Sequence, residues 1–262
     1  MPYSIKNILL SSITLALLGC AGNPAHPDDP YERYNRAVYA FNDTVDRYAI
    51  KPTAEVYRDY TPPPLQSWGS SFLANLNDVW IGVNNVLQGK FTNGMSDVGR
   101  FAINSSLGLF GLFDVATDFG FEKHNEDFGQ TLAKWGAPEG GYFVIPFLSS
   151  STIRDTVALS ADWYLGTPWN AADIPARNAL LGFSIINARS RLLGTEKTLN
   201  EGTLDTYAYV RDFYLQQRRY KIADGKVSKK ESTDDWYDEA EEDHSKTAPP
   251  INPNIKITPL FK

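Results

Sequence analysis

Residues 29–49, DPYERYNRAVYAFNDTVDRYA, decide the fold class that the sequence predicts. Asp29, Pro30 and Glu32 form a capping-box pattern, with an N-cap acid, proline at the first helical position and a glutamate three residues after the cap. We expect the helix to end at Lys51-Pro52, because proline removes a backbone donor from a helix. The apolar residues between these signals recur at helical spacing and form one stripe. They are Tyr34, Ala37, Val38, Phe41, Val45, Tyr48 and Ala49.

Helical periodicity also dominates the rest of the chain. Residues Phe72 to Leu87 form a second apolar stripe, which Gly89 closes because glycine adopts the left-handed conformation that ends many helices. Thr152 begins another capping box, and the last helical pattern covers Asp205 to Tyr220. No stretch shows the alternation of polar and apolar residues that indicates a strand. The pattern therefore predicts an all-α, multi-helix bundle.

Two glycine-containing segments interrupt this pattern. Residues 107–121, LGLFGLFDVATDFGF, contain only two charged residues and are apolar on more than one side, which favours a short helix or turn packed against an apolar surface. Within residues 126–146, three glycines and Pro138 predict a turn between apolar arms, and hence a hairpin-like loop. The three glycines are Gly136, Gly140 and Gly141.

The composition excludes several classes of function. The 262-residue chain has a formal net charge of −6, which argues against nucleic-acid binding because phosphate neutralisation needs clustered Lys and Arg. Its single cysteine cannot form an internal disulfide or a thiolate metal cluster. His26, His124 and His244 stand in unrelated settings, so no pair predicts a metal site. Because no known catalytic or nucleotide-binding motif occurs, we expect no enzyme activity and no metal or other cofactor.

The one cysteine lies at the end of an N-terminal leader. Lys6 precedes an apolar stretch from Ile8 to Leu18, which has the length of a signal-peptide core and is too short to span a bilayer. The tetrapeptide LLGC, which ends at Cys20, resembles the bacterial lipobox. This resemblance implies that residues 1–19 are removed and that Cys20 carries S-diacylglycerol and an N-acyl chain, which together give stable anchoring. The alternatives are an ordinary leader with a chance cysteine and a signal anchor.

Residues on either side of the helical region suggest how the chain is organised. Ala21 follows the lipobox cysteine, where Asp favours inner-membrane retention in well-studied Gram-negative lipoproteins. We therefore expect a lipid-anchored outer-membrane protein on the periplasmic side, with residues 20–28 as a tether and residues 29–220 as the helical domain. Residues 221–262 form an acidic and Pro-rich tail, with eight acids and no Lys or Arg between Glu231 and Asp243. This tail is either a solvated, partly disordered extension or a docking arm for a soluble partner.

Short blocks that include polar positions give a more specific signal than periodicity alone. They are spaced over residues 29 to 220 and resemble the signature of the MlaA, or VacJ, family of outer-membrane lipoproteins. The blocks include DPYERYNR at 29–36, YAFN at 39–42, NVLQG at 85–89, EDFGQTL at 126–132 and RD at 154–155.

The resemblance implies a non-enzymatic role in lipid transport. Members of this family are mostly helical, lie as a ring with interfacial helices in the inner leaflet of the outer membrane, and enclose an amphipathic channel. They take phospholipids mislocalised to the outer leaflet and pass them to the periplasmic carrier MlaC, and they associate with trimeric porins. The chain is accordingly expected to maintain outer-membrane lipid asymmetry. The alternative is a structural, porin-associated lipoprotein without its own lipid path.

The resemblance also indicates two candidate regions in this chain. The helix around Asn35, Phe41 and Asn42 matches a region linked to the state of the channel. The predicted hairpin loop matches a loop that affects access to the channel. Its candidate residues are Gly136, Gly140, Gly141, Tyr142 and Pro146.

We predict that replacing Cys20 by Ala leaves the protein unanchored and inactive in maintaining lipid asymmetry, because the acyl chains can no longer be attached. Membrane fractionation of cells that produce Cys20→Ala measures this. A variant that still fractionates with the outer membrane like the wild-type chain would refute the lipobox.

Overall fold

The computed structural model describes residues 26–166 and 173–226, without the side chains of residues 195–202. The leader, Cys20, most of the predicted tether and the acidic part of the tail lie outside these ranges. The chain divides into two compact units, Met1–Tyr214 and Leu215–Lys262. In the second unit, the last turns of α10 (Thr206–Ile222) are followed by a turn in which Asp224 and Gly225 have positive φ. All other elements belong to the first unit.

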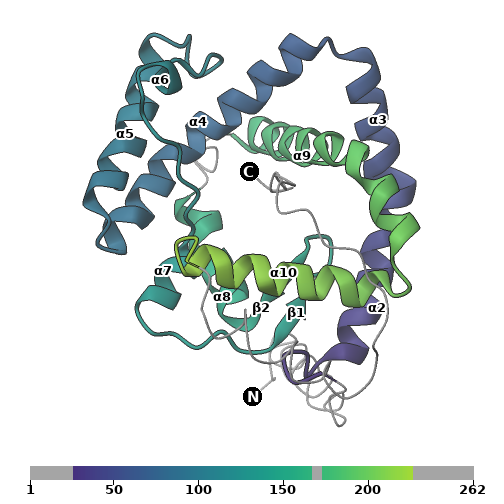
Figure 1. Ribbon diagram of the computed structural model, residues 1–262. Coiled ribbons are helices and arrows are strands. Elements are labelled where there is room, and N and C mark those ends of the chain that lie inside the picture. Colours follow the sequence, from purple (N-terminus) through teal and green to yellow (C-terminus); the bar gives the residue numbers. More distant parts are fainter. Residues whose placement is uncertain (1–25, 167–172, 227–262) are drawn as a thin grey trace, which may run out of the picture. The chain divides into compact units, whose positions relative to one another are not determined.

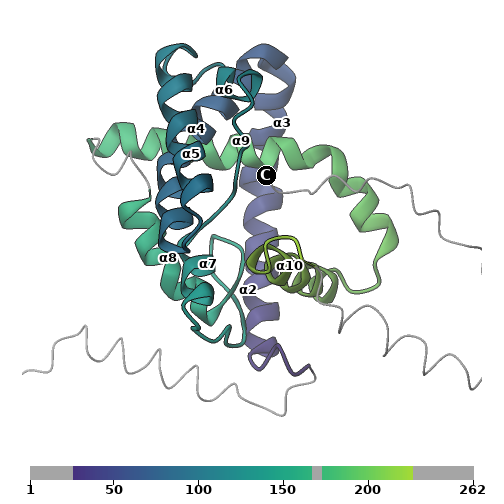
Figure 2. The same cartoon turned by 60° about the vertical axis from the view of Figure 1, so that its left-hand side comes forward.

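The N-terminal helices differ from the sequence prediction at both ends of the first stripe. The chain forms α2 (Glu32–Val45), the π-helix η1 (Asp46–Ile50) and α3 (Lys51–Tyr60), which follow one another along one column (Figure 2). The predicted stop at Lys51-Pro52 is wrong. The N–H of Lys51 bonds to the carbonyl of Asp46, five residues back, and Pro52 then lies in the first turn of α3, where its missing donor costs little.

Helices α4 (Pro63–Leu87) and α5 (Phe91–Ser106) pack side by side (Figure 1). Pro62 is extended immediately before α4, and Gly89 (φ 82°) ends it as predicted. The two helices approach closely at Gly82 and Gly94. A Cβ on Gly94 would lie 2.6 Å from Cγ2 of Val86 and 2.8 Å from the carbonyl oxygen of Gly82. Glycine is therefore what permits this contact between the helices.

Two short helices precede the hairpin along the chain, and two longer helices follow it. The short α6 (Val115–Asp118) and α7 (Phe128–Lys134) precede the hairpin, and α8 (Ile153–Leu165) and α9 (Ile174–Gly202) follow it. Thr152 is the N-cap of α8, and its side chain accepts a hydrogen bond from the N–H of Asp155, which confirms the capping prediction at this position.

The expectation that the chain has no strand is wrong at one place. β1 (Tyr142–Val144) pairs antiparallel with β2 (Ser150–Thr152). Three residues per strand are too few for alternation to stand out in the sequence. The predicted hairpin bounds are also shifted, because the chain reverses between β1 and β2, where the N–H of Ile145 bonds to the carbonyl of Ser149. The turn from Gly136 to Gly141 precedes the hairpin instead of forming its tip.

Contacts within the first unit close into a circuit. α2 contacts β1, the hairpin contacts α8, α8 contacts α7, and α7 contacts α4; α4 contacts α9, α9 contacts α3, and α3 returns to α2 through η1. This order is consistent with the ring-like bundle that the family resemblance implies, and the predominantly helical fold class is confirmed. None of the described helices is long and apolar enough to cross a bilayer.

The types of residue that this fold buries are unusual. Among the largest fully buried side chains of the described ranges, only Tyr142 and Val144 are apolar, and the others are mainly Asn and Asp, with two Thr and Arg100. Many large apolar side chains are exposed instead. A soluble protein of this size normally buries its large aliphatic residues and exposes its charges. In the described part of the chain, polar side chains therefore predominate among the fully buried ones, and many large apolar side chains face outward.

We predict that Gly94→Ala lowers the free energy of unfolding by about 1–3 kcal/mol, because the added methyl must push α4 and α5 apart. Thermal unfolding of the detergent-solubilised protein measures the change. Gly182→Ala in α9 is the matched control. No atom lies within 4 Å of its added Cβ, so it should leave stability unchanged or raise it by roughly 0.5–1 kcal/mol. Equal melting temperatures for the two variants would contradict the close packing of α4 and α5.

Candidate functional site

Two asparagines of α2 dock the helix onto the hairpin by imitating peptide groups. Asn35 is fully buried; its Nδ2 donates to the carbonyl of Tyr142 at 3.0 Å, and its Oδ1 accepts the N–H of Val144 at 2.8 Å. Two turns further on, Asn42 donates to the carbonyl of Ile145 at 2.9 Å and accepts the N–H of Phe147 at 2.8 Å. The structure thus joins the two candidate regions of the sequence into one site, which we call the α2–hairpin site.

Aromatic side chains cover these hydrogen bonds. Tyr34 stacks on Phe143 with 5.1 Å between ring centroids, and Phe41 meets Phe147 edge to face at 4.9 Å. Phe147 has a left-handed φ of 62° and is exposed at the tip of the hairpin, beside Pro146. Such a conformation is strained for a bulky residue, so the contacts with Phe41 and Asn42 must hold it.

The predicted glycines have different roles at this site. A Cβ on Gly141 would lie 2.5 Å from the ring of Pro30, so only glycine lets the two segments pass each other. Gly140 has a φ of 71° and packs against Ile153. Gly136 makes a turn at the end of α7 and has no atom near its Cβ position, so it is not part of the α2–hairpin site.

Asp29 has a role that the sequence did not predict. It is not the N-cap of α2, because Tyr31 holds that position without a side-chain cap. Its carboxylate is fully buried and accepts from Asn35 at 2.8 Å, from the hydroxyl of Tyr207 at 2.5 Å and from Arg211 at 3.5 Å. A buried carboxylate is stable only with such donors. Asn35 is six residues away in the sequence, but Tyr207 and Arg211 are 178 and 182 residues away, so the sequence could not indicate them.

Two tyrosines meet between the hairpin and α10, with 6.2 Å between the ring centroids of Tyr142 in β1 and Tyr207 in α10. Tyr142 is fully buried and shares a 2.6 Å hydrogen bond with Ser150, and burial raises its pKa to about 12. Burial, followed by the hydrogen bond to Asp29, also raises the pKa of Tyr207. Arg36 lies 4.4 Å from the centre of the Tyr207 ring and pairs with Asp205 at 2.7 Å. Both tyrosines therefore remain protonated at neutral pH, and Tyr207 is a neutral donor to Asp29.

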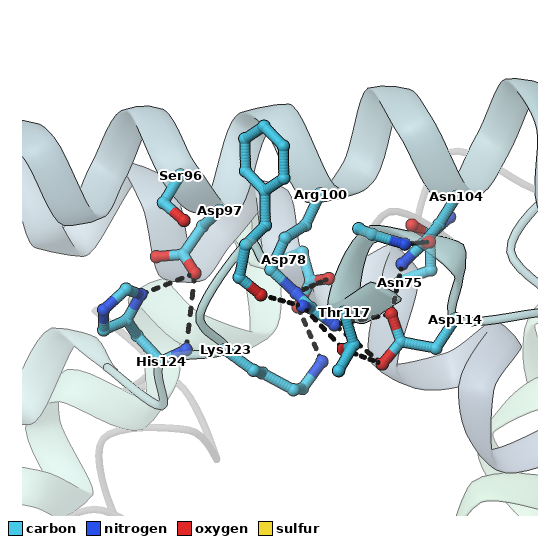
Figure 3. Close-up of polar contacts among 12 residues, drawn as sticks. Asn75, Asp78, Ser96, Asp97, Arg100, Asn104, Asp114, Thr117, Lys123 and His124 are labelled. Carbon is cyan, nitrogen blue, oxygen red and sulfur yellow. Dashed lines mark hydrogen bonds and ion pairs between the residues drawn. The ribbon is translucent and has the colours of Figure 1, made fainter. Parts of the chain in front are cut away.

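A second polar cluster lies between α4, α5 and α6 (Figure 3). Arg100 of α5 is buried and donates twice to Asp114 at 2.8 Å, once to Thr117 at 3.0 Å and once to the carbonyl of Phe121 at 2.6 Å. Its Nε faces Asp78 at 3.6 Å. We call this group the Arg100 cluster.

The two carboxylates that face Arg100, those of Asp78 and Asp114, have pKa values shifted in opposite directions. Burial raises the pKa of Asp78, against the opposing effects of Lys123 and Arg100. Burial acts in the same direction on Asp114. The hydrogen bonds that Asp114 accepts, the first of them from Thr117, outweigh burial and lower its pKa. Asp114 is thus held as a carboxylate beside Arg100.

The same cluster fastens the segment that follows α6. Lys123 pairs with Asp78 at 2.8 Å, and Nδ1 of His124 lies 3.0 Å from Asp97, which also accepts from Asn85 at 2.8 Å (Figure 3). Each buried carboxylate in this part of the structure therefore has a donor. Within the described ranges, no group of three or more His, Cys, Asp or Glu side chains could hold a metal ion.

The match to a known family covers both groups of residues. The MlaA lipoprotein family matches residues 27–221, which is most of the chain. The chain belongs to the MlaA lipoprotein family. The α2–hairpin site and the Arg100 cluster both lie within the matched residues.

Individual MlaA proteins are similar over nearly their full lengths. The chain is 30% identical over 242 residues to the intermembrane phospholipid transport system lipoprotein MlaA of Haemophilus influenzae, covering 88% of this chain and 96% of that protein. It is 32% identical over 227 residues to the MlaA of Escherichia coli strain K12, covering 84% and 89%. A solved structure described as the structural basis for maintenance of bacterial outer membrane lipid asymmetry is 31% identical. Its TM-score is 0.66, over 74% of this chain and 98% of that one.

We predict that Asn35→Ala and Asn42→Ala have different consequences for this MlaA-family chain. Asn35→Ala removes one of the donors of buried Asp29 and leaves the carbonyl of Tyr142 and the N–H of Val144 without the side chain that pairs with them. The free energy of unfolding should therefore fall by on the order of 3 kcal/mol. Asn42→Ala acts near the exposed tip and should cost less than about 1 kcal/mol, while the amide of Phe147 exchanges faster. Chemical unfolding and hydrogen exchange measure these effects. Equal destabilisation by the two variants would contradict the arrangement described.

Proposed function

We propose that this MlaA-family chain is an outer-membrane lipoprotein, anchored through acylated Cys20 on the periplasmic side. In this role it removes phospholipids mislocalised to the outer leaflet and passes them to the periplasmic carrier MlaC, in association with a trimeric porin. It thereby maintains the lipid asymmetry of the outer membrane. Family membership and the names of the H. influenzae and E. coli relatives support this function.

The exposed apolar surface supports the proposal most strongly. Contiguous exposed apolar side chains mark a surface that meets lipid or another apolar partner, which is what a protein that collects phospholipid from a membrane requires. On α4, the exposed apolar residues follow helical spacing, and α5 continues this surface. They are Val79, Val83, Val86 and Leu87 on α4, and Phe91, Met95 and Val98 on α5.

The α2–hairpin site gives the proposed path a point of control. Asn42 and Phe41 contact the hairpin near its exposed tip, whereas Asn35 holds its buried base. The tip can therefore move while the base stays attached to α2. In this proposal, movement of residues 145–149 controls access of lipid, and the chain performs no covalent chemistry on it.

We predict that deleting the gene for this chain in its own host increases the amount of phosphatidylethanolamine in the outer leaflet. An amine-reactive reagent that does not cross membranes measures this amount on intact cells. The wild-type chain restores the low level, and Cys20→Ala does not. Gly182→Ala, whose added methyl meets no atom, is the control that should restore it fully.

Affinity purification of the same strains separates the two candidate roles. The structural alternative requires the chain to co-purify with a porin while outer-leaflet phospholipid stays unchanged by the deletion. That combination would reject lipid transport as the function.

A further inference from the structure

The loop between α5 and α6, residues 107–113 (LGLFGLF), has an unusual combination of properties. It contains no charged residue, and its large side chains are turned outward. Phe110 is 76% exposed, which makes it one of the most exposed apolar side chains among the described residues. The exposed members are Leu107, Leu109, Phe110 and Phe113.

The exposed tip of this loop has a strained backbone. Leu109, Phe110 and Gly111 have successive φ values of 53°, 59° and 88°. Glycine adopts this left-handed region easily, but Leu and Phe do so rarely because their Cβ atoms clash with the backbone. Two adjacent bulky residues in this conformation indicate that the surrounding structure imposes the shape of the tip.

Contacts beneath the loop supply this constraint. A Cβ on Gly111 would lie 2.4 Å from Nδ2 of buried Asn75, so the backbone at Gly111 rests directly on α4. At the end of the loop, Asp114 is held by Arg100 in two 2.8 Å hydrogen bonds and by Asn104 at 3.0 Å. The loop is therefore clamped at its centre and at its exit.

Most backbone donors of the loop are already satisfied within the protein, which favours immersion in hydrocarbon. Six of its seven N–H groups bond to carbonyls of the loop itself or of the last turn of α5. In hydrocarbon, unlike in water, each backbone donor must be satisfied within the protein. The N–H groups that bond in this way are those of Leu107, Gly108, Phe110, Gly111, Leu112 and Phe113.

We propose that residues 107–113 form a rigid, preformed apolar wedge that inserts among the acyl chains of the membrane leaflet, positioned from below by the Arg100 cluster. The occupant of the surface is lipid hydrocarbon, because the loop offers apolar side chains and no free charge for a polar partner. This inference rests on the membrane location in the proposed function. It adds the element that sets the depth of the chain and displaces the acyl chains around it.

Site-specific labelling of the full-length lipidated protein tests the wedge. Cys20 is the only cysteine, and it is acylated in the proposed mature protein, so Phe110→Cys adds one reactive thiol for an environment-sensitive fluorophore. Glu122→Cys is the control, because Glu122 is an exposed charged residue that also follows α5. The probe is a phosphatidylcholine vesicle that contains lipid brominated in the acyl chain, with aqueous iodide as the opposing quencher.

The expected result is at least three-fold stronger quenching by brominated lipid at position 110 than at 122, and the reverse order for iodide. Equal iodide quenching at both positions overturns the proposal. Shielding of position 110 that occurs only after a porin trimer is added also overturns it, because a protein and not lipid would then cover the loop.

Two further variants test the clamp in the labelled Phe110→Cys background. Asp114→Asn removes the charge that Arg100 holds and should increase iodide quenching at position 110 at least two-fold without changing the circular dichroism spectrum. Asp118→Asn removes an exposed carboxylate of α6 and should change neither measurement. If Asp114→Asn unfolds the protein, Thr117→Val, which removes one hydrogen bond of Arg100, replaces it. Unchanged quenching in a folded clamp variant overturns positioning by Arg100.

The labelling experiment and the lipid-asymmetry measurement together distinguish failure of the wedge from failure of the proposed function. Normal outer-leaflet phosphatidylethanolamine in cells, combined with iodide-accessible position 110 in vesicles, rejects the wedge and retains the proposed function. A wedge that is buried in lipid, combined with unchanged asymmetry after deletion, rejects the proposed function and retains the wedge.

Discussion

The structure depends on the pairing of buried polar groups with one another. Because the outer faces of α4 and α5 are apolar, the polar side chains lie inside, where an unpaired charge or amide is costly. In Arg100, the two terminal nitrogens donate to a carboxylate, a hydroxyl and a backbone carbonyl from three different segments, while Nε lies 3.6 Å from Asp78 without a hydrogen bond among the described residues. Removing a partner therefore disturbs the loop, α6 and the following segment together.

A similar principle links α2 to the hairpin, but with neutral groups. Asn35 and Asn42 present amides that match peptide groups, so they fix the register of β1 without adding charge. Asn35 is sealed from solvent and Asn42 is not. We propose that this difference gives the hairpin a fixed base and a tip that can be released, as a loop that controls lipid access requires.

The sequence predicted what is local and missed what is distant. Helical periodicity identified the helical fold, and Thr152 and Gly89 marked helix ends, because these signals depend on neighbouring residues. Asp29 is of a residue type that N-cap positions favour. Its partners Tyr207 and Arg211 are far along the chain, so its burial could not be derived from the sequence. The π-helix before Pro52 and the three-residue strands were missed because backbone geometry of that length leaves little pattern. The sequence indicated both Asn42 and the hairpin as candidate regions, but only the structure shows that they are in contact.

Photocrosslinking in cells tests the central claim most directly. A photoreactive phenylalanine analogue at Phe41 or Phe147 preserves the ring contact at the hairpin tip while it probes what passes there. After irradiation, mass spectrometry of the purified protein identifies each adduct. We predict a phospholipid adduct at one or both positions. Adducts with porin at both positions and no lipid adduct at either would contradict it.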